Sequence, residues 1–86
     1  MLKVEIYTKL SCPYCTAAKE LLNSKGAQFI EYRAGEDEKL KEEMLARSNG
    51  HRTFPEIFIN GKHIGGFDDL SALDQNGELD ALLRTG

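Results

Sequence analysis

Two cysteines separated by two residues are the feature that most constrains this chain. Cys12 and Cys15 are its only cysteines, and they stand where a strand pattern gives way to a helix pattern. Residues 2–7 alternate between apolar and polar side chains, which predicts a strand. Residues 13–24 predict a helix, because Pro13 suits the first helical position. Side chains three positions apart at a helix start lie about one turn apart on the same side. The pair can therefore open and close as a disulfide, which favours thiol–disulfide chemistry.

The size and charge of the chain exclude several classes of protein. Its 86 residues predict a single domain over residues 1–86. A net charge of −3 gives no basic face for nucleic acid. No stretch is long and apolar enough to span a membrane, and the N-terminus shows no export signal. One closely spaced cysteine pair would stabilise little, so we expect chemical cysteines in a reducing, cytoplasmic compartment.

The remaining patterns predict an α/β protein of order β-α-β-α-β-β-α. Asn60-Gly61 is a strong two-residue hairpin signal between the last two strands. We expect a four-stranded mixed sheet whose first strand runs parallel to the second and antiparallel to the third, with helices on both faces. The predicted strands are residues 2–7, 28–32, 56–59 and 62–64, and the predicted helices are 13–24, a second opening at 35–38 and ending at 48–50, a third capped by Asp68 or Asp69 and running to Asn76, and 78–84.

Several polar residues receive no firm functional prediction. Tyr7 and Tyr32 are predicted to be ordinary strand residues, and the charges beside Met44 to form a solvated helix face. Two interpretations of the basic residues before Pro55 stay open. These residues either balance the charge of an anionic ligand or are solvated surface charges. These basic residues are Arg47, His51 and Arg52.

The two cysteines are predicted to have unequal roles. Cys12 sits at the N-cap, where free backbone N–H groups and the helix dipole favour a thiolate. Lys9, three residues upstream, is the nearest candidate cation to stabilise it. Cys15 lies one turn inside the helix and is expected to be less exposed, so Cys12 attacks and Cys15 resolves. The alternatives are two inert small side chains or half of a zinc site, for which His51 and His63 are not at finger spacing.

Two further stretches are candidates for ligand binding. A cis bond before Pro55 would turn the backbone of Phe54 toward the cysteines for pairing with an extended peptide. From local sequence alone a trans bond is expected, since cis is found at only ~5–6% of such positions. Gly65-Gly66-Phe67-Asp68-Asp69 either binds a carboxylate at a helix start or is a glycine turn with an aspartate cap, and the local sequence favours the turn.

Taken together, these stretches resemble the glutaredoxins of the dithiol class, in the small bacterial form. The resemblance rests on three motifs in order, Cys12-Pro13-Tyr14-Cys15, Thr53-Phe54-Pro55 with the strand to Gly61, and Gly65 to Leu70. It implies a thioredoxin fold, glutathione as co-substrate with no tightly bound cofactor, and a monomer. It also implies protein disulfide substrates such as ribonucleotide reductase.

The resemblance also implies a glutathione groove that passes over Cys12. Pro55 is expected to be cis and next to Cys12, with the Phe54 backbone pairing with the cysteinyl part of glutathione and Tyr14 lining the groove. The other two parts of glutathione, the γ-glutamyl group and the glycine, are assigned to the two ends of the groove. The backbone at Phe67 and Asp68 is expected at the γ-glutamyl carboxylate, Asp68 or Asp69 near its amino group, and Lys9 and His51 near the glycine carboxylate.

The function predicted is glutathione-dependent reduction of protein disulfides and protein–glutathione mixed disulfides. One alternative is a redoxin that a thioredoxin-type reductase reduces. Another is an iron–sulfur carrier in which two chains share a cluster through Cys12 and glutathione, which Pro13 disfavours by resemblance. Phe54, His51 and Phe67 depart from common family residues. Phe54 and Phe67 are expected to narrow the groove and alter substrate preference, and His51 to make binding pH-dependent near neutrality.

Overall fold

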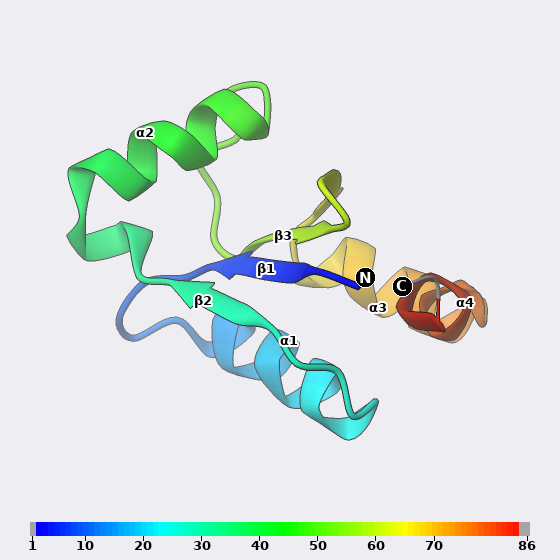
Figure 1. The fold of residues 1–86 in the computed structure, drawn as a ribbon. Coiled ribbons are helices and arrows are strands. Elements are labelled where there is room, and N and C mark those ends of the chain that lie inside the picture. The colour runs from blue at the N-terminus through cyan, green and yellow to red at the C-terminus, as the bar shows by residue number, and fades with distance from the viewer. Residues whose placement is uncertain (1, 85–86) are drawn as a thin grey trace.

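A four-stranded sheet organises the molecule, as the computed structural model shows for residues 2–84 (Figure 1). The strand order is β2-β1-β3-β4. β1 (Val4–Tyr7) runs parallel to β2 (Ile30–Tyr32) and antiparallel to β3 (Glu56–Ile59), which turns at Asn60-Gly61 into β4 (Lys62–Gly65). The predicted pairing of all four strands is confirmed, and the second strand is two residues shorter at its start than predicted.

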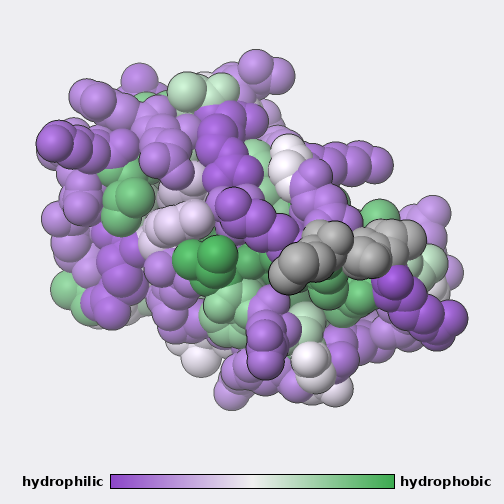
Figure 2. All heavy atoms as spheres, viewed as in Figure 1, coloured by the Kyte–Doolittle hydropathy of each residue, from purple (hydrophilic) through white to green (hydrophobic). Residues whose placement is uncertain are grey.

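Helices cover both faces of the sheet, as predicted (Figure 1). α2 (Glu38–Arg47) lies over one face, while α1 (Pro13–Ser24), α3 (Phe67–Gln75) and α4 (Glu78–Arg84) lie on the other side. The core is correspondingly split in two. Its larger part packs β1 and β3 against α1, α3 and α4, and the smaller part under α2 consists of Tyr7, Ala34, Met44 and Phe58. Polar side chains dominate the face shown in Figure 2.

Two helix starts differ from the predicted ones. The second helix is preceded by a separate 3-10 turn (Ala34–Glu36), because the Asp37 side chain accepts hydrogen bonds from Lys39 N and Leu40 N and so begins α2 one turn later. The third helix is capped by Gly66, not by Asp68 or Asp69. Asp69 accepts a hydrogen bond from Gly66 N at 3.1 Å and thus supports the cap from inside the helix.

A polar network under α2 joins side chains whose contacts the sequence did not predict. Arg47 donates to both carboxylate oxygens of Glu5, at 2.9 and 3.0 Å, and to the Tyr7 hydroxyl at 2.8 Å. The Tyr7 hydroxyl donates to Glu43, and that of Tyr32 donates to Glu5. Glu5 and Tyr7 are buried because α2 covers their face of β1. Arg47 is therefore committed to this network, and the interpretations of Arg47 as an anion ligand or a solvated charge are both wrong.

The network changes the acid–base properties of its members. Hydrogen bonds from Arg47 hold the pKa of Glu5 below its usual range, against the effect of burial. Burial, and then the hydrogen bond to Glu43, raises the pKa of Tyr7 to about 12. Glu5 is therefore a carboxylate and Tyr7 a neutral phenol at neutral pH. Over residues 2–84, no helix has the length and apolar character needed to cross a bilayer.

Candidate active site

Cys12 occupies the position predicted for the attacking cysteine. It is the N-cap of α1 with extended backbone (φ −116°, ψ 99°), and Pro13 follows as the first helical residue. The Cys12 Sγ accepts a hydrogen bond from Cys15 N at 3.2 Å. Pro13 has no N–H, so the donor comes from the third residue of the helix. A helix N-terminus with an N–H aimed at sulfur is the environment in which a thiolate is bound.

Cys15 lies behind Cys12 in the protein interior. Cys15 is 2% exposed, compared with 9% for Cys12. Burial, followed by the hydrogen bond to Cys12, raises the pKa of the Cys15 thiol. Cys15 is therefore a protonated thiol at neutral pH, and the expected asymmetry in exposure is confirmed.

The segment before β3 packs against Cys12 from the opposite side. The Phe54–Pro55 peptide bond is cis, so the expectation from local sequence is wrong and the one from the family resemblance is confirmed. The Cys12 Sγ lies 4.0 Å from the Phe54 carbonyl oxygen. The Phe54 ring packs into the smaller core with Lys9 Nζ 5.8 Å from its centroid. The ring thus faces α2 while its carbonyl faces the nucleophile.

The start of α3 forms a further wall of the site. Tyr14 is 62% exposed and its ring stacks on Phe67, with centroids 6.0 Å apart. A side chain at Gly66 would contact the Pro55 carbonyl at 3.5 Å, so the third motif lies directly beside the second. Asp68 and Asp69 are both exposed, and Asp69 accepts a hydrogen bond from Gly66 N. Tyr14, Pro55 and Phe67 are thereby brought together around the start of α1.

Lys9 and His51, assigned to one end of the tripeptide, have different neighbours. Lys9 lines a cleft beside Cys12 and contacts the Phe54 ring. The His51 ring lies 5.2 Å from the ring of His63, on the β4 strand. His51 and His63 thus meet beside Glu56, although they are twelve residues apart in the sequence.

Sequence reasoning missed one side of the site. A cleft of about 520 Å³ opens between the loop before Cys12, the first turns of α1 and the end of β2, and an ion pair of 3.1 Å between Lys19 and Glu31 lies in its wall. Gly35 allows the chain after β2 to touch the loop, since any side chain there would collide with Lys9. No local motif marks these residues, because only the parallel pairing of β1 and β2 brings them together.

The fold and this site define a class of protein. A βαβαββα arrangement with a dithiol at the start of its first helix and a cis proline facing the dithiol is a thioredoxin-fold oxidoreductase site. The predicted fold is confirmed by solved structures. The solution structure of glutaredoxin from Brucella melitensis matches with a TM-score of 0.85 and 52% identity, over 100% of this chain and 92% of that one. The crystal structure of the buckwheat glutaredoxin–glutathione complex matches with a TM-score of 0.85 and 29% identity, over 95% and 76%.

Sequence comparisons identify the family. The glutaredoxin family model matches residues 4–64. Glutaredoxin 3 of Escherichia coli (strain K12) is 55% identical over 84 residues, which cover 98% of this chain and 100% of that protein. A glutaredoxin of Pseudomonas aeruginosa is 50% identical over 80 residues, 93% and 94% of the two chains. The chain belongs to the glutaredoxin family, and its activity is that of a glutathione-dependent thiol–disulfide oxidoreductase.

Proposed function

We propose that Cys12 is the nucleophile in every turnover. The observation that carries this proposal is the surroundings of its sulfur, with Cys15 N at 3.2 Å on one side and the Phe54 carbonyl oxygen at 4.0 Å on the other. The Cys12 thiolate attacks the glutathione sulfur of a protein–glutathione disulfide. The S–S bond breaks, and the protein sulfur leaves as a thiolate that takes a proton from water. A second glutathione thiolate then attacks the Cys12–glutathione disulfide, so that glutathione disulfide leaves and the Cys12 thiolate returns.

Cys15 acts when the substrate is a protein disulfide. Attack by Cys12 then leaves the substrate protein attached through a mixed disulfide. Cys15 loses its proton, attacks the Cys12 sulfur and displaces the substrate as a thiol. Two molecules of glutathione reduce the resulting Cys12–Cys15 disulfide and leave as glutathione disulfide. The raised pKa of Cys15 supports this order, because a protonated, buried thiol does not compete for the first attack.

The glutathione site is proposed to run across Cys12 from Lys9 to the start of α3. Two features support it: the Phe54 backbone beside Cys12, which an extended peptide can pair with, and the N-terminal turn of α3 beside Pro55. Asp68 is the better partner for the ammonium group of glutathione, because Asp69 already binds the Gly66 N–H. The full proposed set is Lys9, Tyr14, His51, Phe54, Pro55, Phe67, Asp68 and Asp69.

A pair of single variants tests the division of labour between the cysteines. We expect Cys15→Ser to keep reduction of a glutathionylated peptide and to lose most reduction of a peptide disulfide. Cys12→Ser should lose both activities. Both reactions can be followed by coupling glutathione disulfide formation to glutathione reductase. Equal loss of both activities in Cys15→Ser would refute the assignment of Cys15 as the resolving thiol.

The wider setting follows from the same chemistry. We propose that residues 1–86 act as a single monomeric domain with no tightly bound cofactor. A cytoplasmic location suits an enzyme that needs reduced glutathione, because that compartment keeps thiols reduced. Ribonucleotide reductase is the proposed type of protein substrate, on the strength of the family resemblance alone. Gel filtration and a coupled ribonucleotide reductase assay check the monomer and the substrate.

A further inference from the structure

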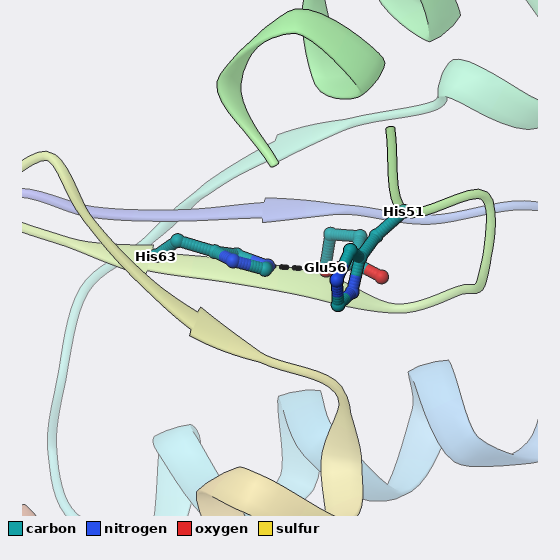
Figure 3. A group of neighbouring side chains, drawn as sticks. All are labelled: His51, Glu56 and His63. Carbon is teal, nitrogen blue, oxygen red and sulfur yellow. Dashed lines mark hydrogen bonds and ion pairs between the residues drawn. The ribbon is translucent and has the colours of Figure 1, made fainter. Parts of the chain in front are cut away.

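Three potential metal ligands converge on the α2 face of the sheet. Glu56 comes from β3, His63 from β4, and His51 from the loop between α2 and β3 (Figure 3). One ligand atom from each residue lies within 4.8 Å of the others. Figure 3 shows the two imidazoles pointing toward the carboxylate from opposite sides. The group contains no cysteine, so it is separate from the zinc half-site considered for the CxxC motif.

The carboxylate at the centre is buried. Glu56 is 1% exposed, and a buried carboxylate is costly unless it is paired. Its Oε1 lies 2.6 Å from His63 Nε2, and its Oε2 accepts a hydrogen bond from Thr53 Oγ1 at 2.7 Å. A carboxylate has about four acceptor positions, so Glu56 keeps unused capacity on the side that the imidazoles face. The contact between His63 Nε2 and Glu56 Oε1 holds a proton, because two unprotonated acceptors would repel at 2.6 Å. A divalent cation would take the place of that proton between the carboxylate and the imidazoles.

The ligands are held by the surrounding structure. The His63 ring packs on Phe58, with centroids 5.0 Å apart, and the hairpin register pairs these two residues across the strands. Ser48 Oγ donates to the His51 carbonyl at 3.2 Å and so fixes the loop from which that side chain extends. Thr53 orients the carboxylate through its second oxygen. Such outer partners are typical of metal sites, where they orient the ligands.

We propose that His51, Glu56 and His63 bind a divalent transition metal, Zn²⁺ in the first instance. Two imidazoles and one carboxylate form a known zinc ligand set, with a fourth position left for water. Bonds of about 2.1 Å at tetrahedral angles separate ligand atoms by about 3.4 Å. The His63–Glu56 pair must therefore open by about 0.8 Å, and His51, on an exposed loop, closes on them.

The bound metal has a structural consequence near the active site. It joins the loop that leads into Phe54-Pro55 to both strands of the β3–β4 hairpin. The metal therefore restricts the motion of the Phe54-Pro55 segment, which faces Cys12. It also engages His51, which the proposed glutathione site assigns to the glycine carboxylate. Metal binding and a role of His51 in glutathione binding are thus alternatives at one side chain.

The test must exclude binding by the thiols. The protein used is the Cys12→Ser/Cys15→Ser double variant of the full chain, titrated with Zn²⁺ by calorimetry and with Co²⁺ by visible absorption. The chain has two histidines, so the ring nitrogen resonances in ¹⁵N NMR report on both ligands without ambiguity. We expect one equivalent of Zn²⁺ to bind and to shift both rings.

Ligand variants made in the same background complete the test. Removing a residue that only supports a metal ligand typically lowers metal affinity 10–100-fold. Removing a direct ligand should cost at least as much, so we expect His51→Ala, Glu56→Gln and His63→Gln each to lower the Zn²⁺ affinity at least tenfold. Glu42→Gln, an exposed carboxylate on α2, is the control and should bind like the parent. His51→Ala keeps the test valid if a buried variant fails to fold. The proposal is overturned if no Zn²⁺ binds, if only one ring shifts, or if His51→Ala loses less than tenfold.

Discussion

Removing the guanidinium of Arg47 should destabilise the protein strongly, although Arg47 contacts no residue of the active site described above. Arg47→Met keeps the length of the side chain and deletes two hydrogen bonds to Glu5 and one to Tyr7. Glu5, whose side chain is 5% exposed, then stays buried without its main partner. Breaking one side of a buried ion pair costs about 3–5 kcal/mol. We expect about 3 kcal/mol, the low end of that range, because Tyr32 still donates to Glu5 and 27% of the Arg47 side chain is exposed.

The loss should depend on pH in a defined direction. In the native protein Arg47 lowers the pKa of Glu5, so this pair contributes stability above pH 4.5, the ordinary value, and loses it as the pH falls through the lowered value. In Arg47→Met the largest effect that lowers the pKa of Glu5 is removed, so ionised Glu5 contributes less stability to the variant at neutral pH than to the native protein. The difference between the two proteins should therefore shrink from pH 7 to pH 4.

Urea unfolding, followed by far-ultraviolet circular dichroism at both pH values, measures the free energy of unfolding. Arg33→Met is the matched control, since Arg33 is 53% exposed and pairs with Glu36 on the surface. It should cost no more than about 1 kcal/mol, with little pH dependence. Glu5→Met combined with Arg47→Met should recover part of the loss, because a buried pair replaced by apolar side chains is often tolerated. A loss in Arg47→Met that equals the control, or that grows on acidification, would refute the reasoning.

Chemical labelling and three single variants probe the active site. At pH 7 iodoacetamide should alkylate Cys12 well before Cys15, whose thiol is buried with a raised pKa; peptide mass spectrometry checks this, and equal labelling would contradict it. Asp69→Ala should cost about 1 kcal/mol of stability by removing the acceptor for the N–H of Gly66, the N-cap of α3. Asp68→Ala, one position earlier, should instead raise the KM for glutathione with little change in stability; the reverse outcome would exchange their roles. Gly35→Ala should cost about 1–3 kcal/mol in urea unfolding, because its methyl group collides with the loop before the dithiol, and unchanged stability would show that this loop is free to move.

Local sequence predicted the elements whose signals are local. The bounds of α1, β3 and α4 are as predicted, and Pro13 together with the cysteine spacing marked the start of α1. The hairpin signal at Asn60-Gly61 was likewise sufficient for the β3–β4 pairing. The Asn60-Gly61 turn also sets the register that brings His63 opposite Phe58, on the same face of the sheet as Glu56. The sequence therefore contained the signal for the His63–Glu56 contact, but this contact was not predicted.

Features that depend on distant packing were not predictable. The alternation in β1 marks Glu5 and Tyr7 as polar positions, but only the docking of α2 buries them and supplies Arg47 from 42 positions away. The cis bond before Pro55 has no local signal strong enough to overcome the usual preference for trans, and only the family resemblance indicated it. The approach of His51 to Glu56 depends on the path of a whole loop.

The sheet separates two interiors that depend on different physical effects. The side formed by α1, α3 and α4 is held by apolar packing, which acid does not weaken, whereas the α2 side depends on a carboxylate and a guanidinium. Amide hydrogen exchange at low pH should therefore rise first in α2, while α1, which carries the dithiol, stays protected. The protein would respond to acid as two cooperative units that share one sheet.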